Sequence, residues 1–304
     1  MNIWQALFLG ALQGVSELFP VSSLAQSILL RSLLGWNFDA EGSYLTSLVA
    51  LHLATAAALF IYFWKDWRVV VYAFIGSAKR GKFVYDEASK FAWLLVAGTV
   101  VVGFFGLVFE KRLRLLFDDP KKTWIVAAVL VANGLMMLMA DVLKRRASEQ
   151  ERRAAAATTP PATNDPMTDA PPSQRRNAED LTMIEGAAIG ATQTLALVPG
   201  VSRSGITIAA GLLAGLSYEQ ATRFSFMLAT PVIGLAAILK VPSLFKPEAR
   251  HMLGMTAASA LVAGICAYLS TKFLMRYFRH HRLGPFGWYC IVFGLFALIM
   301  LWRS

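Results

Sequence analysis

The chain has 304 residues, of which 56% are apolar and 16% are charged, and its mean hydropathy is +0.52. A water-soluble domain needs more polar surface than this, so the composition excludes a soluble protein and predicts an all-α polytopic membrane protein. The formal net charge of +10 comes from basic residues in short connectors between apolar runs, without a basic stripe interleaved with aromatic residues, which argues against nucleic acid as a partner.

The first apolar stretch, residues 3–34, is interrupted at its centre by the string QGVSELFPVSS. At ~1.5 Å per residue, the arm before the break is roughly 25 Å long and the arm after it about 16 Å, whereas the hydrocarbon core is ~30 Å thick. Neither arm spans this core comfortably. Irregular backbone at membrane depth occurs only where protein or water surrounds it, so we predict a re-entrant helix pair with its tip at Pro20.

Three uninterrupted apolar runs follow, each near the ~20 residues that a spanning helix needs. They are residues 44–64, 91–109 and 124–140. The next segment, residues 144–181, is rich in Pro, Ala, Thr and charged residues and has few large apolar side chains. This composition predicts a flexible cytoplasmic linker.

The second half of the chain repeats the order of the first. An apolar stretch broken by PGVSRSG at residues 199–205 precedes three further runs, residues 224–239, 253–274 and 285–302. Several residues of the two broken stretches also match at a constant offset of 180, namely Gly10 with Gly190, Ala11 with Ala191, Gln13 with Gln193, Val21 with Val201 and Ser22 with Ser202. We therefore predict an internal duplication with repeats at 1–143 and 182–304, each made of one re-entrant pair and three transmembrane helices.

An odd number of crossings separates the two re-entrant pairs, so the second repeat is predicted to be inverted relative to the first. Inverted repeats place their site at the repeat interface near the membrane midplane. The loops at residues 65–90, 144–176 and 276–282 carry sixteen Lys or Arg, whereas the loops on the other side carry nine. The richer side is predicted to be cytoplasmic, which leaves both termini outside.

Arg203 is the most informative residue of the second tip, because an arginine near the membrane centre costs about 2.5–3.5 kcal/mol and needs a compensating partner. Around it lie Ser202, Ser204, Gly205 and Thr207. Hydroxyl groups, a glycine, a helix N-terminus and a guanidinium together suit a phosphate, which accepts hydrogen bonds from several directions. The alternative is a structural arginine paired with a carboxylate of a neighbouring helix.

On the first tip, Gln13 and Glu17 are four residues apart and therefore share one helix face. Ser22 and Ser23 follow the break and are placed to cap the second arm. A carboxylate in a phosphate site is typical of divalent-cation binding, since Mg²⁺ takes one or two carboxylates together with substrate oxygens. We predict that Glu17 binds Mg²⁺, with Ca²⁺ as the other candidate, and the alternative is a plain ion pair with Arg203.

His52 lies inside the first full crossing. Either it transfers protons at the site, or it is a satisfied polar residue between helices, and both interpretations stay open. His280 and His281 lie beside Arg279 and Arg282 and are predicted to be interfacial loop residues.

The chain resembles one known family over nearly its whole length apart from the linker, and two strings carry this resemblance. QGVSELFPVSS and QTLALVPGVSRSGIT are similar to the motifs of the undecaprenyl-diphosphate phosphatases of the bacitracin-resistance type, and the second match is long and specific. The resemblance implies a hydrolase that removes the terminal phosphate of undecaprenyl diphosphate, recycles the lipid carrier for cell-wall synthesis and confers bacitracin resistance. It also implies a location in the bacterial cytoplasmic membrane, with the site facing the outside.

In terms of residues, the resemblance implies that Glu17 holds the metal and that Arg203, with Ser202 and Ser204, binds the diphosphate. Ser23 is then the nucleophile or a phosphate ligand. The predicted catalytic residues are Glu17, Ser23, Arg203 and His52. The predicted phosphate-binding residues are Ser22, Ser202, Arg203, Ser204, Gly205, Thr207, Gln193, Gln13 and Gln26.

Gln26 departs from the family pattern, in which a histidine assigned to acid–base or nucleophilic work usually follows the double Ser. Glutamine neither accepts a proton at neutral pH nor forms a useful phosphoryl intermediate. We therefore expect a metal-activated water ordered by Glu17, with His52 or the diphosphate itself taking the proton.

A transporter is the main alternative function, because an inverted repeat with broken helices at the midplane also suits a flippase of polyprenyl phosphate. The missing histidine favours this alternative, whereas Glu17 and the SRSG string do not discriminate. A purely structural membrane subunit makes no use of two buried polar tips. The expected partners are the polyprenyl diphosphate substrate and membrane lipid, and a homodimer is left open.

Overall fold

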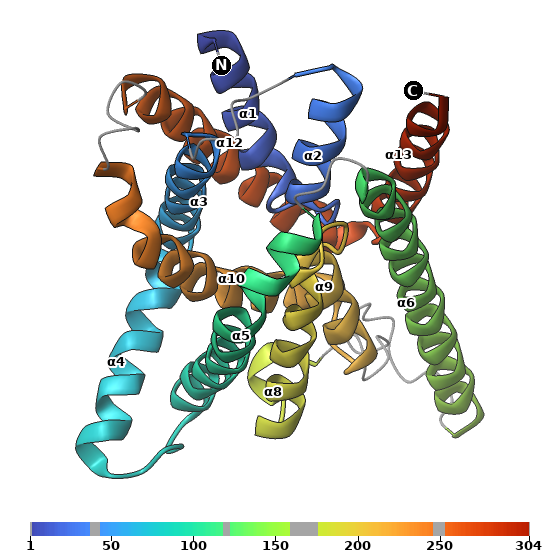
Figure 1. Cartoon of the computed structure of the whole chain (residues 1–304). Helices are drawn as coiled ribbons and strands as arrows, with labels where there is room; N and C mark the ends of the chain where they lie inside the picture. Colours follow the sequence, from blue (N-terminus) through green and yellow to red (C-terminus); the bar gives the residue numbers. More distant parts are fainter. Residues whose placement is uncertain (1, 37–42, 118–121, 159–175, 246–252, 304) are drawn as a thin grey trace.

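The computed structural model describes residues 2–36, 43–117, 122–158, 176–245 and 253–303, and within these ranges it contains helices and no strand (Figure 1). The α-helices are α1 (Ile3–Ser16), α2 (Ser23–Leu33), α3 (Ser43–Tyr62), α4 (Trp64–Arg80), α5 (Glu87–Phe117), α6 (Thr123–Thr158), α8 (Met183–Thr192), α9 (Arg203–Leu213), α10 (Tyr218–Lys240), α12 (Leu253–His280) and α13 (Gly284–Arg303). Short 3-10 helices lie at η2 (Ala178–Asp180), η3 (Gln193–Leu197) and η4 (Val241–Phe245). The prediction of an all-α protein is confirmed.

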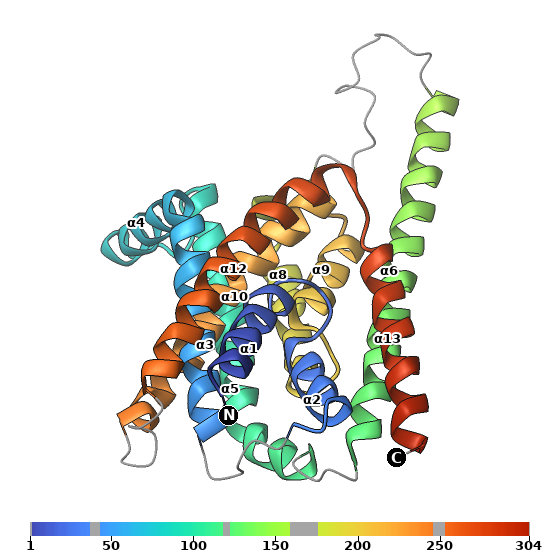
Figure 2. The same ribbon diagram turned by 90° about the horizontal axis from the view of Figure 1, so that it is seen from above.

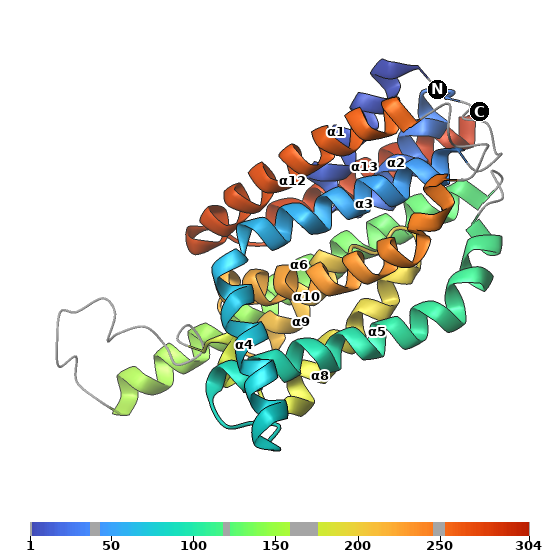
Figure 3. The same cartoon turned by 90° about the vertical axis from the view of Figure 1, so that its left-hand side faces the viewer.

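Six helices correspond to the six predicted crossings. Among the described residues, α5, α6, α10, α12 and α13 are long and apolar enough to cross a membrane, and α3 together with α4 forms a sixth candidate. The helices α1 and α9 are apolar but shorter, as the arms of re-entrant pairs should be. Both chain termini lie at the same end of the molecule, which agrees with an even number of crossings (Figure 3). The chain is therefore a polytopic membrane protein.

The segment after the first crossing is not the loop that the sequence predicts. Residues 64–80 form α4, which bends by 85° away from α3. Its buried residues, Val70, Ala73 and Ser77, recur at intervals of three and four, so they share one face of the helix. Arg223 of α10 donates to Asp66 of α4 at 2.7 Å and to Glu179 of η2 at 2.6 Å. These ion pairs hold the bend against the bundle.

The predicted linker also differs in part from expectation. Residues 144–158 are helical, because α6 continues to Thr158. They are mostly Ala, Arg, Glu and Lys, which are strong helix formers, and this propensity outweighs the lack of large apolar side chains. Residues 159–175 lie outside the described residues.

The chain is attached to the bundle again at Arg176. Its guanidinium donates to a carboxylate oxygen of Glu185 at 2.6 Å and also to the carbonyl oxygen of Ala214. The hydrogen bond from Arg176, with a second from the backbone of Thr182, lowers the pKa of Glu185 to about 2. Arg176 therefore connects the start of α8 to the end of α9.

The helix contacts have the same pattern in both halves of the chain: each contact has an equivalent when every helix is replaced by its counterpart in the other half. α1 packs on α12 as α8 packs on α5, while α6 packs on α13 and α3 packs on α10. Glycines make the first two contacts close: a Cβ added at Gly10 would lie 2.4 Å from the carbonyl oxygen of Ser259, and one at Gly190 would lie 2.3 Å from the Cα of Gly98. This pairing supports the predicted duplication, whose boundaries at 1–143 and 182–304 stay a prediction.

The two broken helix pairs approach each other from opposite ends of the bundle. In Figure 1, α1 and α2 enter from the end that carries both termini, and α8 and α9 enter from the other end. Figure 2 shows these four helices in the middle, with α3 and α12 on one side and α6 and α13 on the other. The helix α10 adds the fully buried side chains of Phe224, Phe226 and Met227 to the core. The tips of the two pairs therefore meet inside the protein.

Candidate functional site

Direct contacts join the two predicted tips. The first tip connects α1 to α2, and the second connects η3 to α9. The hydroxyl of Ser204 donates to the carbonyl oxygen of Phe19 at 3.3 Å. A Cβ added at Gly205 would lie 3.3 Å from the Cβ of Pro20 and 3.1 Å from the sulfur of Met137. Glycine therefore permits the close approach of the tips at this position.

Each tip ends in a capped helix N-terminus. Ser22 caps α2 and accepts a hydrogen bond from the backbone of Ala25 at 3.4 Å, while Ser202 caps α9 and accepts one from Gly205 at 3.1 Å. In the described part of the chain, Ser22 is the sole residue other than glycine with a positive φ, of 62°. Such backbone strain concentrates at functional sites. Two helix N-termini directed at one centre offer N–H groups and positive partial charge to an anion.

Glu17 connects the polar groups of both tips, and only 9% of its side chain is exposed. Its Oε1 accepts a hydrogen bond from Nη2 of Arg203, and its Oε2 accepts one from the hydroxyl of Ser23. Nε2 of Gln13 donates to the same Oε2 at 2.9 Å. The ion pair with Arg203, the alternative to a metal site, is therefore present in the structure and ties the first tip to the second.

His52 reaches the same carboxylate from α3. Its Nε2 lies 3.7 Å from Oε2 of Glu17 and 3.3 Å from Nε2 of Gln13. Its Nδ1 lies 2.8 Å from the carbonyl oxygen of Leu48. A neutral imidazole that donates from Nδ1 to this carbonyl leaves Nε2 as an acceptor facing the site. The sequence does not fix the distance of His52 from the tips, and the structure places its ring within the cluster.

The hydroxyl groups of the SRSG string bond within the protein. The Oγ atoms of Ser202 and Ser204 lie 3.2 Å apart, and Thr207 donates to the carbonyl oxygen of Arg203 at 2.7 Å. Ser202, Ser204 and Thr207 are buried, whereas Arg203 is partly exposed. Of this string, the guanidinium is therefore the group most open to a ligand.

Gln26 occupies the position of the missing histidine, and both ends of its amide are engaged. Its Nε2 donates to the carbonyl oxygen of Val21 at 3.0 Å, and its Oε1 accepts a hydrogen bond from the hydroxyl of Tyr289 at 2.9 Å. Only 1% of the residue is exposed. Gln26 therefore connects the first tip to α13.

Gln193 differs from its counterpart Gln13, whose amide contacts Glu17. Gln193 is 1% exposed, and neither its Nε2 nor its Oε1 has a hydrogen-bond partner among the described residues. It lies in η3, which packs against α9. Because an unsatisfied buried amide costs about 1–3 kcal/mol, this side chain has unused hydrogen-bonding capacity beside the second tip.

Four residues of the cluster are both polar and partly exposed, namely Glu17, Ser23, Arg203 and His52. They are the four that the sequence analysis predicts as catalytic. A hydroxyl bonded to a carboxylate is the arrangement of an activated nucleophile and its base, and the guanidinium suits a negatively charged substrate. The arrangement is therefore competent for attack on a phosphate.

Two residues that support the site were not predicted. Asn133 of α6 is 3% exposed, and its Oδ1 accepts a hydrogen bond from the backbone of Ser202 at 3.0 Å. A polar residue in an apolar run is a signal that could have indicated it. Tyr289, which bonds to Gln26, stands in an aromatic-rich apolar run and carries no such signal.

The donor set for a cation is small. The described residues contain no group of three or more His, Cys, Asp or Glu side chains that could hold a metal ion. Glu17 supplies one carboxylate and Ser23 supplies one hydroxyl. Mg²⁺ often takes one or two carboxylates and completes its shell with water and substrate phosphate oxygens, so these donors fit a cation shared with a diphosphate.

Comparison with known proteins gives a consistent result. The family model described as Bacitracin resistance protein BacA matches residues 6–296. An undecaprenyl-diphosphatase of Mycolicibacterium paratuberculosis is 40% identical over 98% of this chain and 96% of its own length. An undecaprenyl-diphosphatase 2 of Frankia alni is 41% identical over 97% and 96%, and an undecaprenyl-diphosphatase of Granulibacter bethesdensis is 41% identical over 99% and 97%.

Proposed function

The chain belongs to the bacitracin resistance protein BacA family, and on this basis we propose that it hydrolyses undecaprenyl diphosphate to undecaprenyl phosphate and inorganic phosphate. One observation supports this activity most directly: a single carboxylate, Glu17, accepts hydrogen bonds from the hydroxyl of Ser23 and from the guanidinium of Arg203. The carboxylate can act as a base, the hydroxyl as a nucleophile and the guanidinium as the group that binds the phosphate, and all three lie between two helix N-termini. Such a product returns the lipid carrier to cell-wall synthesis, and this recycling accounts for bacitracin resistance.

The first step is attack by Ser23 on the terminal phosphorus. Oε2 of Glu17 takes the proton as the Ser23 oxygen forms its bond to phosphorus, and the bond from phosphorus to the bridging oxygen breaks. Undecaprenyl phosphate leaves, and the terminal phosphoryl group stays on Ser23. Water then attacks the phosphorus of the phosphoserine and gives a proton to Nε2 of His52, while the bond from phosphorus to the Ser23 oxygen breaks. The proton held by Glu17 returns to that oxygen, which restores the hydroxyl as inorganic phosphate leaves.

Protonation of Glu17 also changes what Arg203 binds. The guanidinium is paired with Glu17 in the structure, and 16% of its side chain is exposed. Once Glu17 takes a proton, its negative charge is lost and the attraction that holds the guanidinium weakens. Negative charge develops on the phosphoryl oxygens in the same step, so Arg203 interacts more strongly with the transition state than with the free enzyme. The N-termini of α2 and α9 act in the same direction.

His52 and Gln193 have supporting roles in this proposal. Nε2 of His52 lies 3.7 Å from the Glu17 carboxylate, so it is placed to accept the proton of the attacking water in the second step. We infer that Gln193, whose buried amide has no partner among the described residues, donates to a phosphate oxygen. To take up that proton, Nε2 of His52 gives up its 3.3 Å contact with Nε2 of Gln13, whereas the Gln193 amide has no competing partner among the described residues.

A divalent cation fits beside these residues. Glu17 and Ser23 would hold Mg²⁺ together with the diphosphate oxygens, and the cation would supply charge neutralisation of the substrate. We also propose that the protein lies in the cytoplasmic membrane with its site facing outward. The loops rich in Lys and Arg favour the cytoplasmic side, which leaves the other ends of the helices, with both termini, outside. The transporter alternative gains no support from the relatives, which are named as diphosphatases.

The test is release of inorganic phosphate from undecaprenyl diphosphate by purified protein in detergent, with and without a chelator. Ser23→Ala is compared with Ser27→Ala, which removes a buried hydroxyl one turn further along the same helix. We expect phosphate release that the chelator reduces, that Ser23→Ala lowers by about a thousandfold, and that Ser27→Ala leaves near the wild-type rate.

A phosphoserine on Ser23, trapped by acid quenching and found by mass spectrometry, would support the covalent route. Activity of Ser23→Ala within tenfold of wild type would show that water attacks directly. Folded wild-type protein that binds the lipid without releasing phosphate would refute the hydrolase and favour the transporter.

A further inference from the structure

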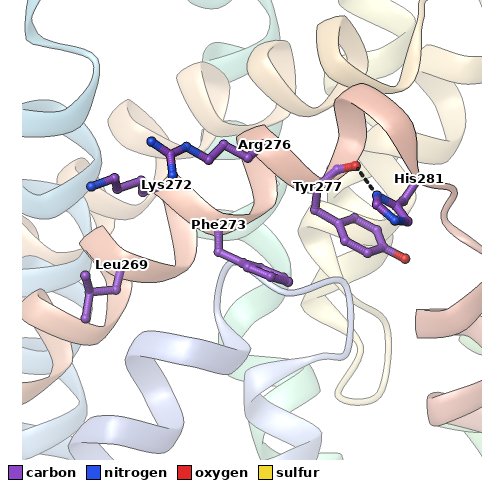
Figure 4. Close-up of a pocket in the computed structure, with 6 residues that line it drawn as sticks. All are labelled: Leu269, Lys272, Phe273, Arg276, Tyr277 and His281. Atoms are coloured by element: carbon purple, nitrogen blue, oxygen red, sulfur yellow. Dashed lines mark hydrogen bonds between the residues drawn. The ribbon is translucent and has the colours of Figure 1, made fainter.

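A second candidate site lies along the C-terminal half of α12. A hollow of about 400 Å³ is lined there by Leu269, Lys272, Phe273, Arg276, Tyr277 and His281 (Figure 4). These residues recur at intervals of three and four, so they share one face of the helix. No Asp or Glu is among them. We call this hollow the α12 groove.

Two cations of the α12 groove have no ion-pair partner among the described residues. Lys272 and Arg276 are exposed and one turn apart, and neither forms an ion pair with a described carboxylate. Arg279 of the same helix, in contrast, pairs with Glu219 at 2.8 Å. Two unpaired cations at this spacing can bind one phosphate between them.

An exposed apolar stripe continues the same face of α12 away from the cations. Leu261, Ile265 and Leu269 follow at intervals of four and are 66%, 53% and 57% exposed. From Leu261 to Lys272 the helix rises by eleven steps of ~1.5 Å, about 16 Å in all, and one leaflet contributes roughly half of the ~30 Å hydrocarbon core. The stripe therefore has the length of one leaflet and ends at the two cations.

We propose that the α12 groove binds an anionic membrane phospholipid. Its phosphate lies between Lys272 and Arg276, and an acyl chain lies along Leu269, Ile265 and Leu261. The complementary charge and the one-leaflet stripe favour a lipid over a soluble anion, because a soluble anion uses the cations alone.

Aromatic contacts connect the α12 groove to the first tip. The ring of Phe273 stacks on that of Phe19, with centroids 5.9 Å apart and an angle of 6° between the planes. The carbonyl oxygen of Phe19 accepts the hydrogen bond of Ser204, and Glu17 precedes it by two residues. In Figure 4 the Phe273 side chain points toward the ribbon of this first tip. A lipid that orders Phe273 therefore also supports the tip that carries Glu17, a consequence that rests on the proposed function.

The test is lipid binding by the full chain, measured by native mass spectrometry with phosphatidylglycerol against phosphatidylcholine. Lys272→Gln/Arg276→Gln is compared with Lys79→Gln/Lys82→Gln, which removes two exposed charges elsewhere. We expect the first variant to bind phosphatidylglycerol about thirtyfold more weakly, as the loss of two basic residues near an anionic surface predicts, and the control to bind as wild type. Equal binding by both variants overturns the proposal.

Further probes identify the occupant. Polyprenyl monophosphate retained in preference to phosphatidylglycerol, or displacement of the lipid by millimolar inorganic phosphate, overturns the phospholipid assignment. Lys272→Arg/Arg276→Lys keeps both charges and should restore binding. Phosphatidylglycerol should also stimulate phosphate release by wild type and the control but not by Lys272→Gln/Arg276→Gln. Because binding is measured without turnover, an inactive wild type refutes the proposed function and leaves the binding result to decide this proposal.

Discussion

The ion pair between Glu17 and Arg203 gives a quantitative prediction, because it joins the two tips at a buried position. The side chains are 9% and 16% exposed, so removal of one partner leaves a charge largely shielded from water. Breaking a buried pair in this way typically costs about 3–5 kcal/mol, whereas replacing both charges by neutral groups is often close to neutral. We therefore expect Glu17→Gln and Arg203→Gln each to lower the free energy of unfolding by about 3–5 kcal/mol, and the double variant by clearly less than their sum.

The measurement is a double-mutant cycle on reversible unfolding in mixed micelles, followed by the helical circular dichroism signal, together with phosphate release. We expect the double variant to recover stability but no activity, because both charges are required by the reaction. A double variant as unstable as the sum of the two singles would show that the pair does not couple the tips. Activity in the double variant would refute the roles of both residues in catalysis.

Three further predictions concern the surroundings of the site. His52→Gln should lower the rate of phosphate release by about a hundredfold, while His280→Gln should leave it unchanged. Gly190→Ala should destabilise the protein by about 1–3 kcal/mol in thermal or denaturant unfolding, because its Cβ would meet the backbone of α5 at 2.3 Å, whereas Gly103→Ala, with nothing within 4 Å, should not. Tyr289→Phe should cost about 1–3 kcal/mol by leaving the carbonyl oxygen of a buried glutamine unpaired.

The positions of the breaks could be predicted because they depend on local sequence. Proline and polar residues within an apolar stretch mark a helix end at any depth, and Pro20 and Pro199 both lie in the observed tips. The class of fold followed from composition, and the six crossings followed from the length of the apolar runs. These features need no knowledge of what each segment contacts.

Other features depend on packing between distant segments and were not accessible in the same way. The 85° bend before α4 is held by Arg223, which bonds to Asp66, 157 positions earlier in the chain, and to Glu179, 44 positions earlier. Tyr289 contacts Gln26 across 263 positions. The start of the predicted linker differs from expectation for a local reason. Residues 144–158 have few large apolar side chains, but the helix propensity of their Ala, Arg and Glu residues is high enough to continue α6.

The replacement of histidine by Gln26 bears on which group acts as the base. Both polar atoms of the Gln26 amide are engaged, one by Val21 and one by Tyr289, so this side chain has no free acceptor for a proton. The Ser23 hydroxyl instead donates to Glu17, and in the described part of the chain His52 reaches that same carboxylate from a different helix. In the proposed mechanism, proton transfer from Ser23 therefore has a path that does not pass through position 26. We propose that Glu17, a base supplied by the first tip itself, acts in place of the usual histidine in this chain.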